Sequence, residues 1–138
     1  MPKLCRSLVL NRCIETLWTN GRIRQINSSF IATIRNFDVL IIDSDGAIYA
    51  TLTAEEESDD AINDFVVDDL LRFAFTSHTS QLIKMWAPND NEWEVVAQWK
   101  CPGKFPAFLQ IDPQSHFLAC ATSGQQCYFY EIHNQNLF

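Results

Sequence analysis

The chain has 138 residues, is 47% hydrophobic and carries a formal net charge of −7. This length is enough for one domain with a sizeable core, and the apolar fraction excludes a disordered chain. No segment approaches the roughly 18 apolar residues of a membrane span. The N-terminal apolar stretch, Leu8–Leu10, is too short for a secretory signal. We therefore expect an intracellular globular protein that does not contact a membrane.

The charge is distributed unevenly along the chain. Residues 1–36 hold six Lys/Arg against one Glu, whereas residues 37–70 hold eleven Asp/Glu and no basic residue. An acidic chain is a poor general binder of nucleic acid, because phosphate contacts need clustered bases. The basic N-terminal part could still meet RNA or an acidic protein, although a solvated surface is favoured. Any RNA contact is therefore expected to be indirect.

The first predicted strands are short, apolar and rich in β-branched residues, at 30–34, 39–42 and 47–52. Asp43-Ser-Asp-Gly46 separates the last two, and Gly46 supplies the backbone freedom that a tight turn often requires. An acidic loop over 54–61 then precedes the next strands. Its carboxylates form a candidate docking site for a basic partner, with a solvated loop as the favoured alternative: Glu55, Glu56, Glu57, Asp59 and Asp60. Phosphate on Thr53 or Ser58 would strengthen such docking.

The second group of predicted strands covers 62–67, 71–76, 82–87 and 93–99. The third group covers 106–111, 117–121 and 126–132, with Asp112-Pro-Gln-Ser115 as a strong turn because proline presets the backbone angle.

One interval relates these groups. Ile42, Trp86 and Tyr130 occupy equivalent points at spacings of 44 residues, and Asp68 and Asp112 are separated by the same interval. One four-stranded propeller blade uses about 40–45 residues. The chain is therefore predicted to be all-β: an incomplete propeller of about three degenerate blades at 18–53, 62–100 and 106–138. Key turn and blade positions are Asp43, Asp68, Trp86, Asp112 and Tyr130.

Catalytic chemistry has little support in the sequence. The five cysteines are widely spaced without a CxxC pair, and His78, His116 and His133 lack metal-ligand spacing, so they are expected to be turn or surface residues. No Gly-rich phosphate loop is present. We expect no enzyme activity, no cofactor, no metal and no small-molecule substrate. A small β-sheet enzyme or ligand-binding barrel is the less favoured alternative.

Two motifs resemble WD repeats. Phe108 to Gly124 follows the order of a hydrophobic strand, an Asp-Pro turn, a Leu-Ala strand and a Ser-Gly turn, and Ile83-Lys-Met-Trp-Ala87 resembles the terminal Ile-Lys-Leu-Trp-Asp. The Gly-His dipeptide ahead of each repeat is absent, so the Asp–His hydrogen-bond relay of strong repeats cannot be assumed. The resemblance implies a scaffold whose loops and rims bind proteins of a multi-subunit complex.

A narrower resemblance, over roughly 14–132, is to the N-terminal blades of the transducin beta-like 3 family of U3-associated processome proteins. It rests on Ala32-Thr33, Val39–Asp43, the acidic loop and Gln81–Trp86. This resemblance implies a nucleolar role in pre-rRNA processing within the small-subunit processome. The alternative is an unrelated WD-repeat adaptor, of the coat-complex or ubiquitin-ligase type, in the cytoplasm or nucleus. Because three blades cannot close a ring, the chain is expected to be poorly soluble, oligomeric or completed by a partner.

Overall fold

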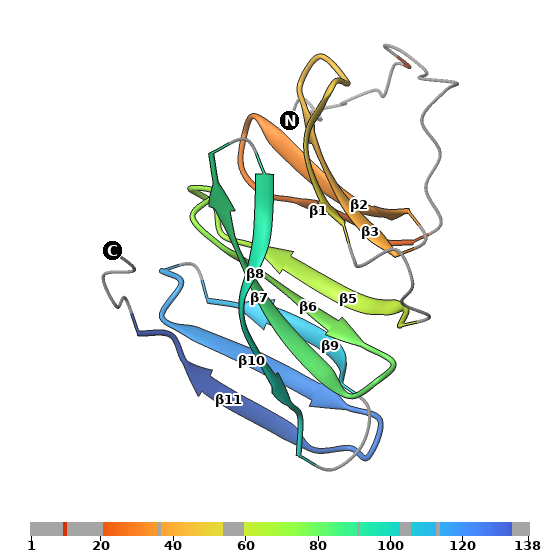
Figure 1. Ribbon diagram of the computed structural model, residues 1–138, viewed down its shortest axis with the longest axis vertical. Helices are drawn as coiled ribbons and strands as arrows, with labels where there is room; N and C mark the ends of the chain where they lie inside the picture. The colour runs from red at the N-terminus through yellow and green to blue at the C-terminus, as the bar shows by residue number, and fades with distance from the viewer. Residues whose placement is uncertain are drawn as a thin grey trace, which may run out of the picture.

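The computed structural model describes residues 10, 21–35, 37–53, 60–90, 92–102, 106–112 and 114–133, and these residues form three antiparallel sheets (Figure 1). We name the sheets blades 1, 2 and 3 in chain order. Blade 1 contains β1 (Ile23–Gln25), β2 (Phe30–Arg35), β3 (Asp38–Asp43) and β4 (Ile48–Thr53). Blade 2 contains β5 (Ile62–Val67), β6 (Ala74–His78), β7 (Leu82–Asn89) and β8 (Glu92–Lys100). Blade 3 contains β9 (Pro106–Ile111), β10 (Phe117–Thr122) and β11 (Cys127–Glu131).

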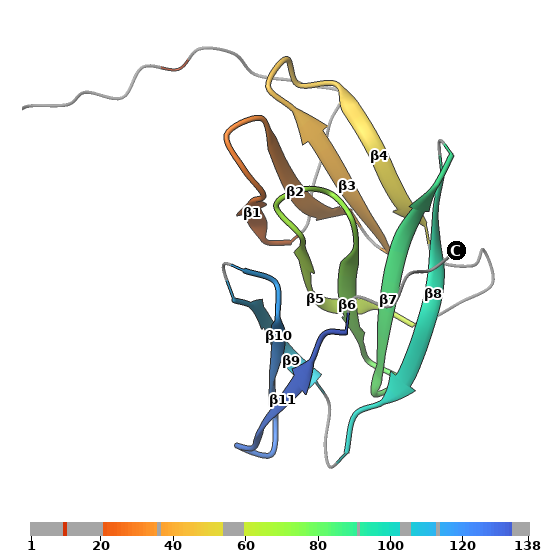
Figure 2. The ribbon, with the colours of Figure 1, turned by 90° about the vertical axis from the view of Figure 1, so that its left-hand side faces the viewer.

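The blades follow one another in space as they do in the chain, with blade 2 between blades 1 and 3 (Figures 1 and 2). Within each blade, consecutive strands pair as a meander. The predicted all-β class and the incomplete propeller are confirmed. The described residues contain no helix, hence none that is long and apolar enough to cross a membrane.

The 44-residue interval survives in the strand registers. Trp86 pairs with Ala74 and Tyr130 pairs with Leu118, so both partners are also 44 apart. A register shift lies directly before Trp86 in the β7–β8 pair, and the same shift lies directly before Ile42 in the β3–β4 pair. The three landmark residues therefore occupy equivalent places in the third strand of each blade.

Two apolar clusters join the blades. The first unites blade 1 residues such as Ile41 and Leu52 with Phe65 and Trp86 of blade 2. The second unites Phe75 and Ile83 of blade 2 with blade 3. Because both faces of blade 2 are covered, its strands β5, β6 and β7 carry apolar side chains toward both neighbouring blades. All five residues of β6 are buried.

The sequence prediction was wrong at two places in the strand pattern. The strand expected over 71–76 begins only at Ala74, because Leu71 has a φ of 58° and belongs to the turn after Asp68. Strand β1 was not predicted, since it has only three residues and two of them, Arg24 and Gln25, are polar.

Candidate protein-interaction site

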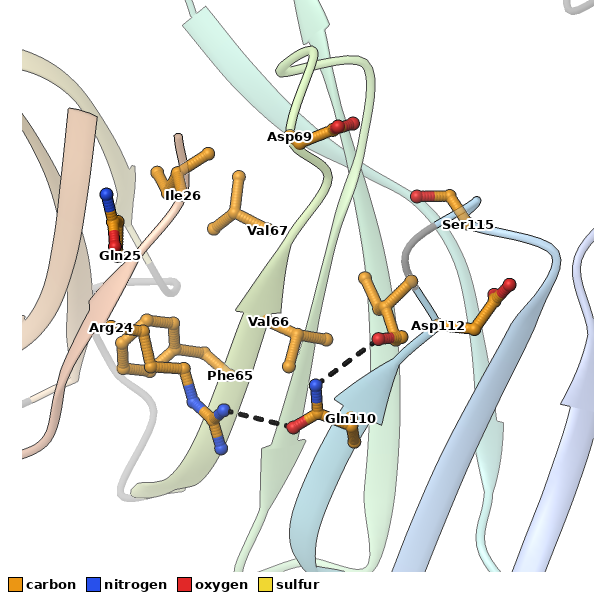
Figure 3. A pocket seen from close by; sticks show the side chains of 11 residues that line it. Arg24, Gln25, Ile26, Phe65, Val66, Val67, Asp69, Gln110, Asp112 and Ser115 are labelled. Atoms are coloured by element: carbon orange, nitrogen blue, oxygen red, sulfur yellow. Dashed lines mark hydrogen bonds between the residues drawn. The ribbon is translucent and has the colours of Figure 1, made fainter. Parts of the chain in front are cut away.

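A cleft of about 360 Å³ opens where the innermost strands of the three blades lie side by side. Figure 3 shows side chains from β1, β5 and β9 converging on it. Six of its eleven lining residues are polar or charged, and the other five are apolar. The lining residues are Arg24, Gln25, Ile26, Phe65, Val66, Val67, Asp69, Gln110, Ile111, Asp112 and Ser115.

Asp64 joins all three blades beside this cleft. Its side chain is fully buried, and its Oδ2 accepts hydrogen bonds from the Arg24 guanidinium at 2.9 Å and from the Leu109 N–H at 2.8 Å. Its Oδ1 accepts the Phe65 N–H at 2.9 Å. Arg24 also donates to the Leu109 carbonyl at 3.2 Å. A buried charge requires such pairing and hydrogen bonding, so blade 1 and blade 3 are both tied to this one carboxylate of blade 2.

Asp68 makes a second connection between blades 2 and 3. Arg72 donates to both of its carboxylate oxygens, at 2.8 and 2.9 Å, and the Ser115 hydroxyl of blade 3 donates to it at 2.7 Å. Burial alone would raise the pKa of Asp68. The hydrogen bonds from Arg72 and Ser115 outweigh burial and hold that pKa below its ordinary value.

A hydrogen-bond relay runs through the interior of blade 2. The Trp86 indole N–H donates to Thr76 Oγ1 at 2.9 Å, and Thr76 Oγ1 lies 2.6 Å from His78 Nε2. His78 Nδ1 lies 3.5 Å from Asp60 Oδ2. Because the Gly-His dipeptide is missing, an Asp–His relay could not be assumed from the sequence, and in blade 2 the hydrogen bonds join Trp86, Thr76 and His78 but do not continue from His78 Nδ1. Asp60 precedes the first strand of the blade and His78 ends its second strand.

The sequence suggested that His78 is a turn or surface residue: it begins the β6–β7 turn, but its side chain is fully buried. Desolvation lowers the pKa of His78 below its ordinary value, against the opposing charge of Asp60. Burial alone would raise the pKa of Asp60, but hydrogen bonds from Ser80 and Thr79 lower it overall.

The positions singled out in the sequence have different surroundings. Asp112 lines the cleft and accepts the N–H groups of His116 and Phe117 at 2.6 and 2.8 Å. These backbone hydrogen bonds lower the pKa of Asp112. Asp43 accepts the Asp45 and Ala47 N–H groups within its own turn. Trp86 packs between blades 1 and 2, and Tyr130 packs between blades 2 and 3.

Only part of the candidate acidic docking loop lies within the described residues. Residues 54–59 lie outside the described residues, and they include Glu55, Glu56, Glu57, Ser58 and Asp59. Asp60 is described, and its carboxylate accepts hydrogen bonds from Thr79 and Ser80 of the β6–β7 turn. Asp60 therefore links the start of β5 to the β6–β7 turn, and these hydrogen bonds orient its carboxylate.

Sequence reasoning missed the residues that organise the cleft: Arg24, Asp64 and Gln110. For Asp64 a signal was present, because a lone carboxylate inside an otherwise apolar strand must be paired if it is buried. Its partners could not be found this way, since Arg24 and Leu109 lie 40 and 45 residues away in the chain.

Reactive groups are scarce among the described residues. The described part of the chain contains no group of three or more His, Cys, Asp or Glu that could hold a metal ion. The thiol of Cys120 is buried, and desolvation together with the neighbouring Cys101 raises its pKa to about 12. Such a thiol stays protonated and is a poor nucleophile.

Comparisons with solved structures identify the fold. A chain in the crystal structure of the mitotic checkpoint complex superposes with a TM-score of 0.64 at 12% identity, over 78% of this chain and 33% of that one. The C-terminal WD40 domain of Sif2 superposes with a TM-score of 0.63 at 8% identity, over 82% of this chain and 34% of that one. The three sheets thus have the WD40 propeller-blade fold, and the chain spans about a third of each matched chain.

No family model matches the sequence. No curated protein matches it either.

Proposed function

We propose that this chain is a non-catalytic scaffold that binds other proteins of a multi-subunit complex. The observation that carries this proposal is the tie at Asp64, which holds three blades in one fixed array around a cleft. A rigid scaffold that positions turns and rims is suited to docking a partner surface. The similarity to a chain of the mitotic checkpoint complex, itself an assembly of proteins, supports this class of role.

We further propose that the complex is the small-subunit processome and that the chain acts in the nucleolus. The support is the resemblance of Val39–Asp43 and Gln81–Trp86 to the N-terminal blades of the transducin beta-like 3 family. In this role the chain contacts pre-ribosomal proteins directly and RNA through them. The alternative function is a WD-repeat adaptor of another complex, which the position of the cleft between the innermost strands favours.

Affinity purification of the tagged chain from nuclear extract, followed by mass spectrometry and RNA analysis, separates these functions. Recovery of processome proteins with U3 RNA is the expected result. Recovery of cytoplasmic adaptors, or of chaperones alone, would exclude the processome.

A pair of charge-reversal variants tests whether the cleft carries the contact. Asp69 is exposed and lines the cleft, whereas Glu92 is exposed on β8 and does not line it. Asp69→Lys should reduce the recovered partners several-fold, and Glu92→Lys should not. Equal recovery of partners with both variants would show that the interaction site lies outside the cleft.

A further inference from the structure

A groove separate from the cleft lies between the last strands of blades 1 and 2. Strands β4 and β8 are neighbours there (Figure 2). The groove has a volume of about 330 Å³. Each of the two blades has four paired strands, so strands of this chain alone form the groove and no further blade is needed to complete it. The lining residues that matter for binding are Thr53, Lys84, Trp86, Trp93, Val95 and Gln98.

Lys84 provides the charge of this groove. Its side chain is half-buried on the face of β7 that also carries Trp86, which packs on blade 1. Glu94 also lines the groove, but it pairs with Ala87 and therefore belongs to the opposite face of the sheet. Among the described residues, Lys84 has neither an ion-pair nor a hydrogen-bond partner for its side chain. Since a half-buried charge costs free energy unless a partner neutralises it, Lys84 is available to an anion.

The repeat gives no structural reason for a lysine at this position. Leu40 and Tyr128 lie 44 residues before and after Lys84, in the third strands of blades 1 and 3. Leu40 is fully buried, and Tyr128 packs against the apolar cluster between blades 2 and 3. Blade 2 therefore has a charge where its two neighbours have a large apolar or aromatic side chain. Such a departure from the pattern of the fold indicates binding rather than packing.

The groups around the Lys84 ammonium fit a carboxylate. Gln98 pairs with Lys84 in the β7–β8 ladder, so the two side chains share a face, and Thr53 brings a hydroxyl from blade 1. One cation and two neutral donors neutralise a single negative charge. A phosphate, with a charge of about −1.5 to −2, would retain excess negative charge beside a chain whose net charge is already −7.

Apolar surface continues the groove from Lys84. Val95 is 39% exposed and pairs with Trp86, which is two residues from Lys84 and hence roughly 7 Å along the strand. Trp93 is half-buried and packs against the apolar cluster between blades 1 and 2. In an extended peptide, residues i and i+2 point to one side at this same spacing.

We propose that this groove docks an extended segment of a partner protein that carries Asp or Glu two positions from a large apolar residue. The carboxylate accepts hydrogen bonds from Lys84, Gln98 and Thr53, and the apolar side chain covers Val95 and Trp93. That the occupant is a protein rests on the proposed scaffold function. The groove and the cleft are different surfaces, so binding at either one can fail without the other.

Selection of peptides from a random display library on the immobilised full chain tests the proposal. The wild type should enrich peptides with an acidic residue two positions from an apolar one. Lys84→Gln should lose this enrichment, and Lys84→Glu should select Lys or Arg in place of the acid. Lys100→Gln is the matched control, because Lys100 is exposed on β8 and does not line the groove. This control and the cleft variant Asp69→Lys should both select the wild-type pattern.

Titration of one enriched peptide measures the size of the effect. Tryptophan fluorescence follows binding, because the Trp93 side chain lines the groove. Lys84→Gln should weaken binding roughly tenfold or more, as expected when a hydrogen bond to a charged group is lost. Far-UV circular dichroism checks that the variants stay folded. Gln98→Ala, at an exposed position, gives a second variant that should weaken binding several-fold.

Three results would overturn the proposal. The first is that the wild type enriches no acidic pattern, and the second is that the pattern survives Lys84→Gln. The third is enrichment that appears only after Glu55, Glu56 and Glu57 are changed to Gln, because the occupant of the groove would then be this chain's own acidic segment.

Discussion

At the scale of single residues, two buried carboxylates, those of Asp64 and Asp68, each organise a hydrogen-bond network that joins the blades. Asp64 is fully buried, and its two oxygens between them accept two backbone N–H groups and the Arg24 guanidinium. Arg22 adds a longer contact of 3.6 Å from a side chain that is 46% exposed. Such exposed pairs contribute little, so Arg24 is the principal counter-ion.

We expect Asp64→Asn to destabilise the chain by about 2–4 kcal/mol, somewhat below the cost of breaking a fully buried pair, because Arg24 keeps partial contact with solvent. In either of its two flipped orientations, the asparagine amide would place its NH₂ group against the backbone N–H of Leu109 or of Phe65, so that one donor faces another. Urea unfolding monitored by tryptophan fluorescence measures the change. Asp69→Asn, at an exposed position, should shift stability by no more than about 0.5 kcal/mol. Equal effects of the two variants would contradict the role of Asp64.

The buried His78 of blade 2 predicts a pH dependence of the free energy of unfolding. Desolvation lowers the pKa of folded His78 below the ordinary value of 6.5, so the unfolded chain binds the proton more tightly. The stabilisation is complete above the unfolded pKa and is lost as pH falls through the folded one. Each pKa unit of difference corresponds to about 1.4 kcal/mol.

The urea midpoint should therefore fall between pH 7 and pH 5 in the wild type and fall less in His78→Gln. The exposed His133, changed to Gln, should leave the slope unaltered. The lowered pKa values of Asp60, Asp68 and Asp112 act in the same direction but below about pH 4, outside this window. Identical slopes in wild type and His78→Gln would show that His78 does not titrate with unfolding.

At the scale of elements, five tight turns share one geometry. In each, the fourth residue donates its N–H to the carbonyl of the first and has a positive φ. The residues in this position are Gly46, Leu71, Gln81, Ser115 and Gln125. Two pairs of these turns are separated by the repeat interval of 44 residues, so the repeat determines turns as well as strands. Only one of the five is glycine, which is why the turn after Asp68 was mistaken for the start of a strand.

Relief of this backbone strain is measurable at Gln125, which is exposed and has a φ of 67°. A side chain in the left-handed region costs about 1–2 kcal/mol, partly offset by the greater entropy of glycine in the unfolded chain. Gln125→Gly should therefore raise stability by about 0.5–1 kcal/mol. Gln125→Ala has the same loss of side chain without the relief and should not stabilise. Thermal unfolding of the wild type, Gln125→Gly and Gln125→Ala measures the difference in stability. Equal melting temperatures would argue against strain at the turn.

At the scale of the whole molecule, blade 2 is the centre of a three-blade stack. Both of its faces are covered by apolar clusters, and β6 is buried along its whole length. Blade 3 has an exposed outer face, where Phe129 is 73% exposed, and β11 forms a sheet edge among the described strands (Figure 1). Stability should therefore decrease from the middle of the stack toward its ends.

Native-state hydrogen exchange tests this gradient. We expect the amides of β6 to exchange slowest, at rates set by global unfolding, and those of β11 that point away from β10 to exchange fastest. The β10 amides paired with β9 provide the internal reference within blade 3. Uniform protection across the three blades would contradict a gradient.

The sequence by itself determined the fold class, because alternation, turn residues and the 44-residue interval are local or periodic properties of the chain. It also identified Asp68, Trp86, Asp112 and Tyr130 as repeated positions. Only the tertiary structure decided which buried polar groups meet: Arg24 with Asp64, Asp68 with Ser115, and His78 with Asp60. These pairings join residues of different strands, blades or turns, at separations between 18 and 47 residues. No sequence period specifies them, since they depend on how side chains from separate strands fill one shared space.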